Sequence, residues 1–548
     1  MTKIAKQDFI FKKNMSIGEV DAENDMVFLE SCFMDTGDYE ALEDTASSKC
    51  IVMGRTGVGK SALLEQLEKN SERVIRINPE ELALKHISNS NVLGFFESLG
   101  VDLDIFYSLL WQHTLVVELI KNKYDIDSAA AKRSFFERLA FLSSDPKKQQ
   151  ALNYIEEWGD KFWVDTETRI KEFTERLEES LKASVGTNIP GIKFTVAAGK
   201  TLTEEQKTEV VSYGKKVVSA VQIAKLAQLI KLLEEDIFTD PQKKTYVLID
   251  RLDEDWVEDK LRYKLIRALI ETVRKFRNIK TVKVAITLRT DLMERVLEHT
   301  KSSGFQREKY DSLFLRVAWG REHLGQLLDR RINYLLKHKY TSADVCFEDI
   351  FPARIEKQSS LDYMLDRTFL RPRDAIMFVN ECLVEAQGKT QITNSIVQLA
   401  EKNYSIKRFE SLTYEWLVEH PNLSKYLEFL SQKKSSFKVS SISSDELDSL
   451  VLELSGEPLE GADLLVKTSH EYMLAKYPNS VSHINLFKQY LLFILYRVGA
   501  VGIKVDGPSS VKWIHDRTQD LSPRKIEGTS IVYVHKMLWR ALAIDKTS

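Results

Sequence analysis

Five short apolar runs stand out along the chain, and the stretches between them have helical periodicity. Short apolar runs bounded by turn or polar residues are typical of the buried strands of a parallel sheet. They predict strands at residues 50–53, 73–77, 245–250, 282–289 and 313–319. Apolar residues at three- and four-residue spacing predict a crossover helix at 261–276. Strands joined by helical crossovers indicate an α/β fold with a five-stranded parallel sheet between helical layers.

The second and third predicted strands are separated by a stretch much longer than a crossover needs. Helical periodicity dominates it at 106–122, 165–182 and 220–236. We interpret residues 80–240 as a mostly helical insertion into the sheet domain. Within it, the alternating residues of 185–199 predict a β-hairpin.

The chain after the last strand predicts further parts. Helical patterns at 322–340 and 360–387 indicate a lid, and the serine- and lysine-rich stretch 431–446 predicts a linker or loop. A helix at 484–497 followed by two strands indicates a winged-helix-like unit. We expect five parts: the N-terminal segment with the start of the core (1–79), the insertion (80–240), the rest of the core (241–320), a helical lid (321–410) and a C-terminal helical and winged-helix-like domain (411–548).

Composition excludes several classes of protein. The chain has 548 residues, 43% hydrophobic, with a formal net charge of −3, which is unlike a disordered or a uniformly basic nucleic-acid-coating protein. No apolar run of about 18 residues occurs, so we expect no membrane span. The four cysteines lie far apart and fit neither a disulfide framework nor a zinc site. We therefore expect a soluble, cytoplasmic protein with no membrane partner.

The clearest chemical signal follows the first predicted strand and opens a helix. Residues 54–61, GRTGVGKS, fill the G-x-x-x-x-G-K-[ST] pattern in the strand–turn–helix context that a phosphate-binding loop needs. Glycines let backbone N–H groups approach the phosphates, Lys60 supplies charge to the β- and γ-phosphates, and the Ser61 hydroxyl ligates Mg²⁺. The residues expected to hold the nucleotide are Gly54, Arg55, Thr56, Gly57, Val58, Gly59, Lys60, Ser61 and Ala62. A chance glycine loop is the alternative, and the flanking strand and helix argue against it.

A second acidic motif, VLIDRLDEDW, spans residues 247–256. Its strand would carry Asp250 to the carboxyl edge of the sheet, where the carboxylate would hold Mg²⁺ through water. Asp253 or Glu254 would then orient or deprotonate the attacking water. We favour Glu254 as the base, with Asp253 second, because spacing alone does not separate them. The alternative for this loop is an acidic surface turn.

Arginines after the fourth strand and in the lid could contact the phosphates. Arg289 lies at the end of that strand and would read the γ-phosphate, unless it is an ordinary surface arginine. Arg371 and Arg373 open an apolar-faced helix, and either could clamp the nucleotide from the lid. Capping or ion pairing by Asp374 is the alternative for both.

The C-terminal tail differs in charge from the rest of the chain. Residues 484–548 contain ten Lys or Arg and five Asp or Glu, a net charge of +5. Such a patch suits phosphate contacts, yet winged helices also serve as packing or protein-interaction modules, and both readings stay open. The basic residues near the predicted wing, with Trp513 among them, are Lys504, Lys512, Arg517, Arg524 and Lys525.

Taken together, the motifs resemble a group of bacterial and prophage P-loop ATPases related to STAND and NACHT signalling ATPases. The segments that carry the resemblance are DTGDYEAL (35–42), GRTGVGKSALL (54–64), LIDRLDEDW (248–256), ITLRTD (286–291), FLRPRDAI (369–376) and VHKMLWRALAI (534–544). The resemblance implies an AAA-like sheet that binds ATP and Mg²⁺. It makes Asp250 the Mg²⁺ residue, with Asp253 and Glu254 as acidic partners, Arg289 the sensor and Pro372 the lid proline that touches adenine.

Proteins of this kind often occur in prophages and defence loci, so the resemblance implies anti-phage defence or phage exclusion. The chain departs from the typical pattern because it lacks a superhelical sensor repeat and a fused N-terminal effector, and because the insertion is long. Three partner classes stay open: another copy of the chain, an effector or sensor protein, and DNA at 484–548. An arginine finger from a neighbouring copy would be Arg307 or Arg316. A nucleotide switch is the favoured function, a DNA motor or loader is the alternative, and a small-molecule kinase fits least.

Overall fold

The computed structural model describes residues 10–82, 85–126, 133–135, 137, 146–220, 223–300, 307–337, 340–459, 463–474, 480–515 and 521–546. Its contacts divide the chain into two compact units, each with a hydrophobic core of its own. The sheet unit comprises Asp35–Arg55 and Lys60–Val317. The C-terminal unit comprises Met1–Met34, Thr56–Gly59 and Ala318–Ser548. The five-part division expected from the sequence stays a prediction.

The sheet unit is built on the parallel five-stranded sheet that the apolar runs predict. Its strands are β1 (Ile51–Gly54), β2 (Val74–Ile77), β3 (Thr245–Ile249), β4 (Val282–Arg289) and β5 (Phe314–Arg316), in the order β2-β3-β4-β1-β5. β4 therefore lies between β1 and β3, with Gly54 opposite Arg289 and Ile249 opposite Ile286. All pairings are parallel, so the carboxyl ends of β1, β3 and β4 share one edge. The predicted α/β fold with a five-stranded parallel sheet is confirmed.

Helices follow the strands as crossovers and as an N-terminal cover. They are α2 (Asp38–Glu43), α3 (Lys60–Asn70), α13 (Asp259–Phe276), α14 (Thr290–His299) and the 3-10 helix η5 (Arg307–Leu313). The apolar stripe of α13, including Leu265 and Leu269, is buried, as its periodicity predicts. This packing fixes β3 and β4 beside each other at the edge where their polar residues emerge.

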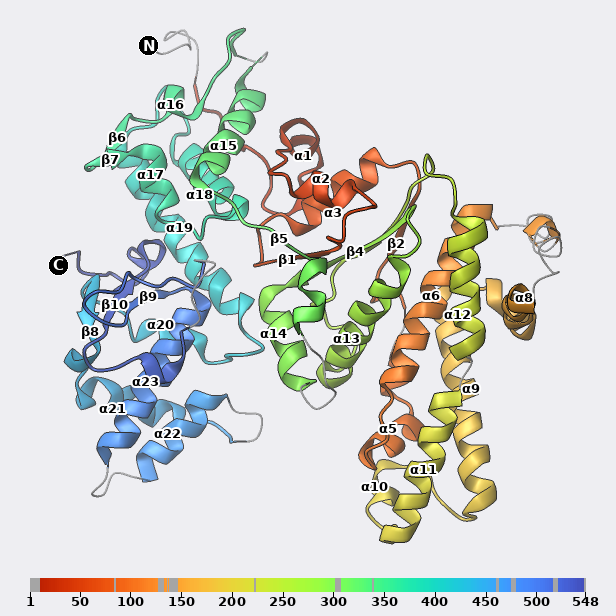
Figure 1. The fold of residues 1–548 in the computed structure, drawn as a ribbon. Helices are drawn as coiled ribbons and strands as arrows, with labels where there is room; N and C mark the ends of the chain where they lie inside the picture. Colours follow the sequence, from red (N-terminus) through yellow and green to blue (C-terminus); the bar gives the residue numbers. More distant parts are fainter. Residues whose placement is uncertain are drawn as a thin grey trace. The chain divides into compact units, whose positions relative to one another are not determined.

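Helices occupy the described residues between β2 and β3. They are α4 (Lys85–Ser88), α5 (Asn91–Ser98), α6 (Asp104–Tyr124), α8 (Pro146–Trp158), η2 (Gly159–Trp163), α9 (Thr166–Asn188), α10 (Val196–Gly199), α11 (Glu204–Ala220), α12 (Ile223–Leu232) and the π-helical turn η3 (Leu233–Ile237). In this stretch α6 packs against α9, α11 and α12, and α9 packs against α11 (Figure 1). The hairpin predicted at 185–199 is wrong, because α9 continues to Asn188 and buries Val185 against the other helices.

The C-terminal unit begins with the N-terminal helices η1 (Ala22–Asn24) and α1 (Met26–Cys32), which join a group of helices from the other end of the chain. These are α15 (Arg321–Leu336), α16 (Phe347–Ile350), α17 (Ser360–Leu365), α18 (Pro372–Glu385), α19 (Asn394–Glu415) and α20 (Leu423–Glu428), with the hairpin β6 (Arg354–Ile355) and β7 (Gln358–Ser359). α18 and α19 pack together through buried residues such as Phe378 and Tyr404, whose rings are stacked.

The unit ends in a small antiparallel sheet of order β8-β10-β9, with helices between its first two strands (Figure 1). Its elements are β8 (Ser436–Lys438), η6 (Val439–Ser441), α21 (Ser444–Leu454), α22 (Leu464–Leu474), α23 (Ser480–Val498), β9 (Val501–Lys504), η7 (Pro523–Lys525), β10 (Ile531–Val534) and η8 (Lys536–Leu538). The helix and two strands expected near the C-terminus are present. Their identification as a winged helix stays a prediction.

The stretch 431–446 is not a linker, which corrects the sequence reading. It contains β8, the turn η6 and Ser443, whose side chain accepts a hydrogen bond from Glu446 N and caps α21. Serine favours helix caps as well as loops, so composition alone did not distinguish the two.

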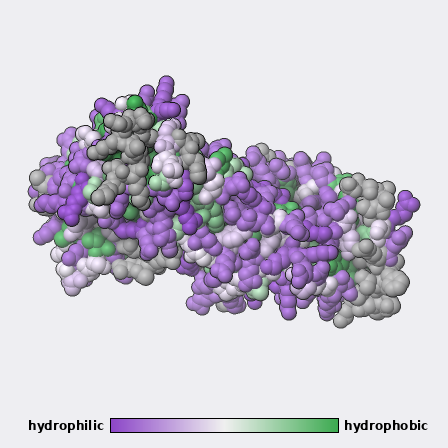
Figure 2. Space-filling view, turned by 90° about the horizontal axis from the view of Figure 1, so that it is seen from above, coloured by the Kyte–Doolittle hydropathy of each residue, from purple (hydrophilic) through white to green (hydrophobic). Residues whose placement is uncertain are grey.

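None of the described helices is both long enough and apolar enough to cross a bilayer. Figure 2 shows a face on which hydrophilic residues predominate.

Candidate functional site

The glycine-rich loop joins β1 directly to α3. The backbone of Gly57 has φ +79° and that of Gly59 has φ +95°, conformations that a residue with a Cβ adopts at a cost. The Lys60 ammonium donates to the carbonyls of Gly54, at 3.3 Å, and Arg55, at 3.1 Å. Lys60 is therefore folded back across the loop in the position from which it can reach an anion.

The residues present fit a magnesium-bound nucleoside triphosphate. The two glycines make a backbone cradle, and the loop runs into the amino-terminal end of α3, which favours negative charge. The Thr56 hydroxyl is buried and has no hydrogen-bond partner among the described residues. Ser61 and Ala62 lie in the first turn of α3. A polar group without a partner beside such a cradle is what a missing polyanion would satisfy.

The electrostatics around Lys60 point the same way. Burial lowers the pKa of Lys60, and the carboxylates of Asp253 and Asp250 act against that shift. A buried cation is costly unless negative charge is near. A bound phosphate would supply that charge directly.

Asp250 follows β3 immediately and lies at the carboxyl edge of the sheet. Its Oδ1 accepts hydrogen bonds from the Thr287 hydroxyl and, at 2.9 Å, from the N–H of Arg251. The register of β3 and β4 brings Thr287 beside it, since Ile249 pairs with Ile286. Thr287 thus orients the carboxylate expected to hold Mg²⁺, and only the sheet pairing reveals this role.

The two candidate bases have different surroundings. Asp253 Oδ2 lies 3.6 Å from Arg289 Nη1, and Asp253 acts electrostatically on Lys60. Glu254 lies 3.7 Å from Arg251 and is 47% exposed, and its partial burial raises its pKa. A raised pKa suits a group that takes up a proton. The proposed roles of Asp253 and Glu254 toward the attacking water both stay predictions.

Arg289 ends β4 opposite Gly54 of β1, which brings it to the same edge as the glycine-rich loop. Its guanidinium makes two hydrogen bonds to the carboxylate of Asp291, at 3.1 and 2.8 Å. Asp291 therefore holds the predicted sensor arginine in place. It lies inside the ITLRTD motif, but the sequence offers no sign of this pairing.

The predicted lid residues lie at the start of α18. Pro372 is the first residue of the helix, where its fixed φ is compatible with helix initiation. Arg371 is buried and makes two bonds to Asp374, at 3.0 and 3.1 Å, so the ion-pair alternative holds for it. Arg373 pairs with Asp21 at 2.9 Å. Its role as a nucleotide clamp stays a prediction.

Of the two proposed arginine fingers, the structure describes only the side chain of Arg316. Arg316 is exposed and lies 3.3 Å from Asp311. The side chain of Arg307 lies outside the described part of the structure. Among the described residues, no group of three or more His, Cys, Asp or Glu side chains is arranged to hold a metal on its own. Mg²⁺ usually keeps several waters and binds through one or two carboxylates together with substrate phosphates.

The residues singled out in the basic tail have different surroundings in the structure. Arg524 and Lys525 are exposed on η7, between β9 and β10. Trp513 packs over Gly502, where an added Cβ would lie 2.5 Å from its ring, and so belongs to the fold of the tail. Arg517 lies outside the described residues.

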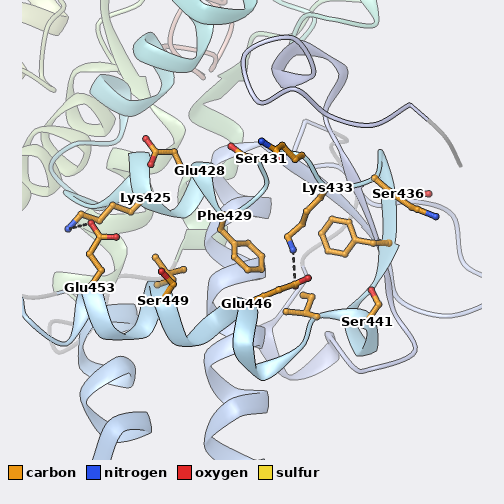
Figure 3. A pocket seen from close by; sticks show the side chains of 15 residues that line it. Lys425, Glu428, Phe429, Ser431, Lys433, Ser436, Ser441, Glu446, Ser449 and Glu453 are labelled. Carbon is orange, nitrogen blue, oxygen red and sulfur yellow. Dashed lines mark hydrogen bonds and ion pairs between the residues drawn. The ribbon is translucent and has the colours of Figure 1, made fainter.

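An open groove of about 790 Å³ lies elsewhere in the C-terminal unit, lined by residues of α20, β8 and α21. Figure 3 shows Lys433 directed toward Glu446 and Lys425 toward Glu453. The Lys433 ammonium is 2.9 Å from Glu446 and lies over the ring of Phe429 at 4.4 Å. The charges of Lys425 and Lys433 are thus matched by carboxylates of the groove itself.

Part of the chain is similar to a described domain. Residues 322–413 match the model of the FunZ-associated C-terminal helical domain. A relative from Escherichia coli strain K12, a putative transposon gamma-delta 80.3 kDa protein, is 22% identical over 555 residues, which cover 98% of this chain and 68% of the relative. The family match therefore describes the helices that run from α15 into α19.

Two solved structures are similar over most of the chain. The Walker-type ATPase PABY2304 of Pyrococcus abyssi has a TM-score of 0.34 and 12% identity, and covers 92% of this chain and 97% of its own. The ORC2 protein of Aeropyrum pernix, solved in ADPNP–ADP complexes, has a TM-score of 0.33 and 12% identity, and covers 97% of this chain and 94% of its own.

Proposed function

We propose that the chain binds ATP with Mg²⁺, hydrolyses it slowly, and acts as a nucleotide-dependent switch that controls a partner or an oligomer. One observation carries this proposal: a glycine-rich loop with two positive-φ glycines leads into a helix at the sheet edge where Asp250 follows β3 and Arg289 ends β4. Lys60 would bind the β- and γ-phosphates. Ser61 and Asp250 would hold the metal ion, which supplies charge neutralisation at the phosphates when bound.

The remaining polar residues at this edge would act on water and on the γ-phosphate. Asp253 or Glu254 would accept the proton of the attacking water, and Arg289 would contact the γ-phosphate after a change of partner from Asp291. These contacts exist only while the γ-phosphate is present. Their loss on hydrolysis is the physical basis of a switch.

The biological role that we propose is anti-phage defence or phage exclusion. The resemblance to prophage and defence ATPases supports it. The transposon relative, at 22% identity, supports a gene carried by a mobile element. The protein that receives the signal would be a further copy of the chain or a separate effector.

Steady-state ATP turnover by the purified protein tests the proposal. Lys60→Ala should abolish turnover, because the phosphates lose their main cationic contact. Lys69→Ala is the matched control, since Lys69 is exposed near the end of the same helix. Equal turnover by wild type and Lys60→Ala would refute the assignment of the site.

A second candidate function is a DNA-binding motor or loader, favoured by the exposed Arg524 and Lys525 between two antiparallel strands. Duplex DNA should then raise turnover several-fold, with an effect that falls steeply as salt increases. Arg524→Glu with Lys525→Glu should remove the stimulation and leave basal turnover unchanged. Turnover indifferent to DNA would leave the partner-controlled switch.

A further inference from the structure

Three consecutive carbonyls of the glycine-rich loop accept hydrogen bonds within the C-terminal unit. The Thr56 carbonyl accepts from Arg371 Nη1 at 2.6 Å. The Val58 carbonyl accepts from Trp319 Nε1 at 2.8 Å, and the Gly57 carbonyl accepts from the backbone N–H of Arg373 at 3.4 Å. The first two donors are side chains far from the loop in sequence.

These bonds decide which way the loop presents its amides. In a planar trans peptide the C=O of one residue and the N–H of the next point in opposite directions. Holding the carbonyls of Thr56, Gly57 and Val58 therefore turns the N–H groups of Gly57, Val58 and Gly59 away from the donors. Amides that converge in this way form an anion-binding nest. A carbonyl turned inward would instead repel a phosphate.

One of the two side-chain donors, Arg371, is itself held firmly. Arg371 is buried, and besides Asp374 it bonds Glu415 at 3.0 Å. Arg408 lies 3.4 Å from Asp374, so this network of charges joins α18 to α19. A buried guanidinium with this many partners has little freedom to move. Gly57 fits tightly against the same helix, since a Cβ there would lie 2.8 Å from the Cβ of Arg373.

We propose that Trp319 and Arg371 are positioning residues that shape the phosphate-binding loop, and that they couple nucleotide binding to the start of α18 and, through Arg371, to α19. This inference rests on the proposed function. Linkage makes the coupling reciprocal: if α18 and Trp319 favour the binding form of the loop, a bound nucleotide favours the packed form of α18. The route uses loop carbonyls, which makes it independent of any arginine contact with the γ-phosphate.

Trp319→Phe is the sharpest test, because it removes the indole N–H and keeps most of the ring. Trp416→Phe is the matched control: Trp416 is a buried tryptophan of the same unit whose Nε1 has no hydrogen-bond partner among the described residues. Titration with a fluorescent ATP analogue and Mg²⁺ should show affinity weakened about three- to tenfold in Trp319→Phe, as expected for one lost hydrogen bond. Trp416→Phe should bind as wild type does.

Hydrogen exchange supplies the readout that a purely structural role would not move. In the wild type, ATP with Mg²⁺ should slow exchange in peptides covering 371–378, where the Arg373 N–H meets the Gly57 carbonyl. In Trp319→Phe this protection should decrease. If Trp319→Phe bound the analogue with the same affinity as the wild type, the coupling would be overturned and the proposed function would stand. The same conclusion would follow if nucleotide had no effect on exchange in these peptides. Absence of nucleotide binding by wild type would remove the proposed function and this inference with it.

Discussion

Substitution of Gly57 by alanine tests the geometry of the loop most directly. At φ +79° an alanine is strained by about 1–2 kcal/mol. Its Cβ would also lie 2.8 Å from the Cβ of Arg373 and 2.9 Å from its Cδ, and such overpacking costs about 1–3 kcal/mol. Together the two effects cost about 2–5 kcal/mol, and the loop would avoid this cost by leaving the conformation that binds the phosphates. We therefore expect Gly57→Ala to weaken ATP binding by about 30-fold or more.

The assay is the titration with a fluorescent ATP analogue and Mg²⁺. Gly37→Ala is a control matched in backbone conformation, since Gly37 has φ +90° but no atom within 4 Å of an added Cβ. It lies before α2, so its strain should leave the affinity for ATP unchanged. Binding by Gly57→Ala within twofold of wild type would refute the close approach of the loop to Arg373 and the need for a left-handed glycine there.

Three further predictions concern the metal site, a buried ion pair and pH. Asp250→Asn should lose most Mg²⁺-dependent turnover, whereas Asp255→Asn, at a 91% exposed side chain, should keep it; equal losses would contradict the metal assignment. Glu401→Gln should destabilise the protein by about 3–5 kcal/mol in thermal unfolding, because it leaves Arg367, 2% exposed, without its carboxylate; an unchanged midpoint would disprove this. Burial lowers the pKa of Lys283 from 10.5 to about 8, so the unfolded chain binds the proton more tightly between these values, and stability should rise with pH from about 8 to 10.5. In Lys283→Met that rise should be smaller, and an identical rise in both proteins would count against the shift.

Much of the sheet unit could be predicted from the sequence because its signals are local. The run predicted at 282–289 coincides with β4, and the helix predicted at 261–276 lies within α13. The burial of a strand, or of one face of a helix, is directly reflected in the spacing of apolar residues along the chain. The errors at 185–199 and 431–446 arose where short-range composition was compatible with both a loop and a regular element. Packing against distant helices or strands then decided between them.

The candidate site divides in the same way. The glycine-rich loop, Lys60 and Asp250 were identifiable because their chemistry needs particular residue types at fixed spacing beside a strand. The residues that orient them gave no such signal. Thr287 reaches Asp250 only through the pairing of β3 with β4. Trp319 reaches the Val58 carbonyl across 261 positions of the sequence.

By itself, the sequence determined the five strands of the parallel sheet, several of the long helices and the position and spacing of the glycine-rich loop, because each depends on neighbours within a few residues. Only the tertiary structure decided the strand order, the hydrogen bond from Thr287 to Asp250, and the contact of Arg371 with Glu415. These features depend on which elements meet in space. Contacts between residues distant in the chain result from the packing of whole elements, and no local pattern encodes them.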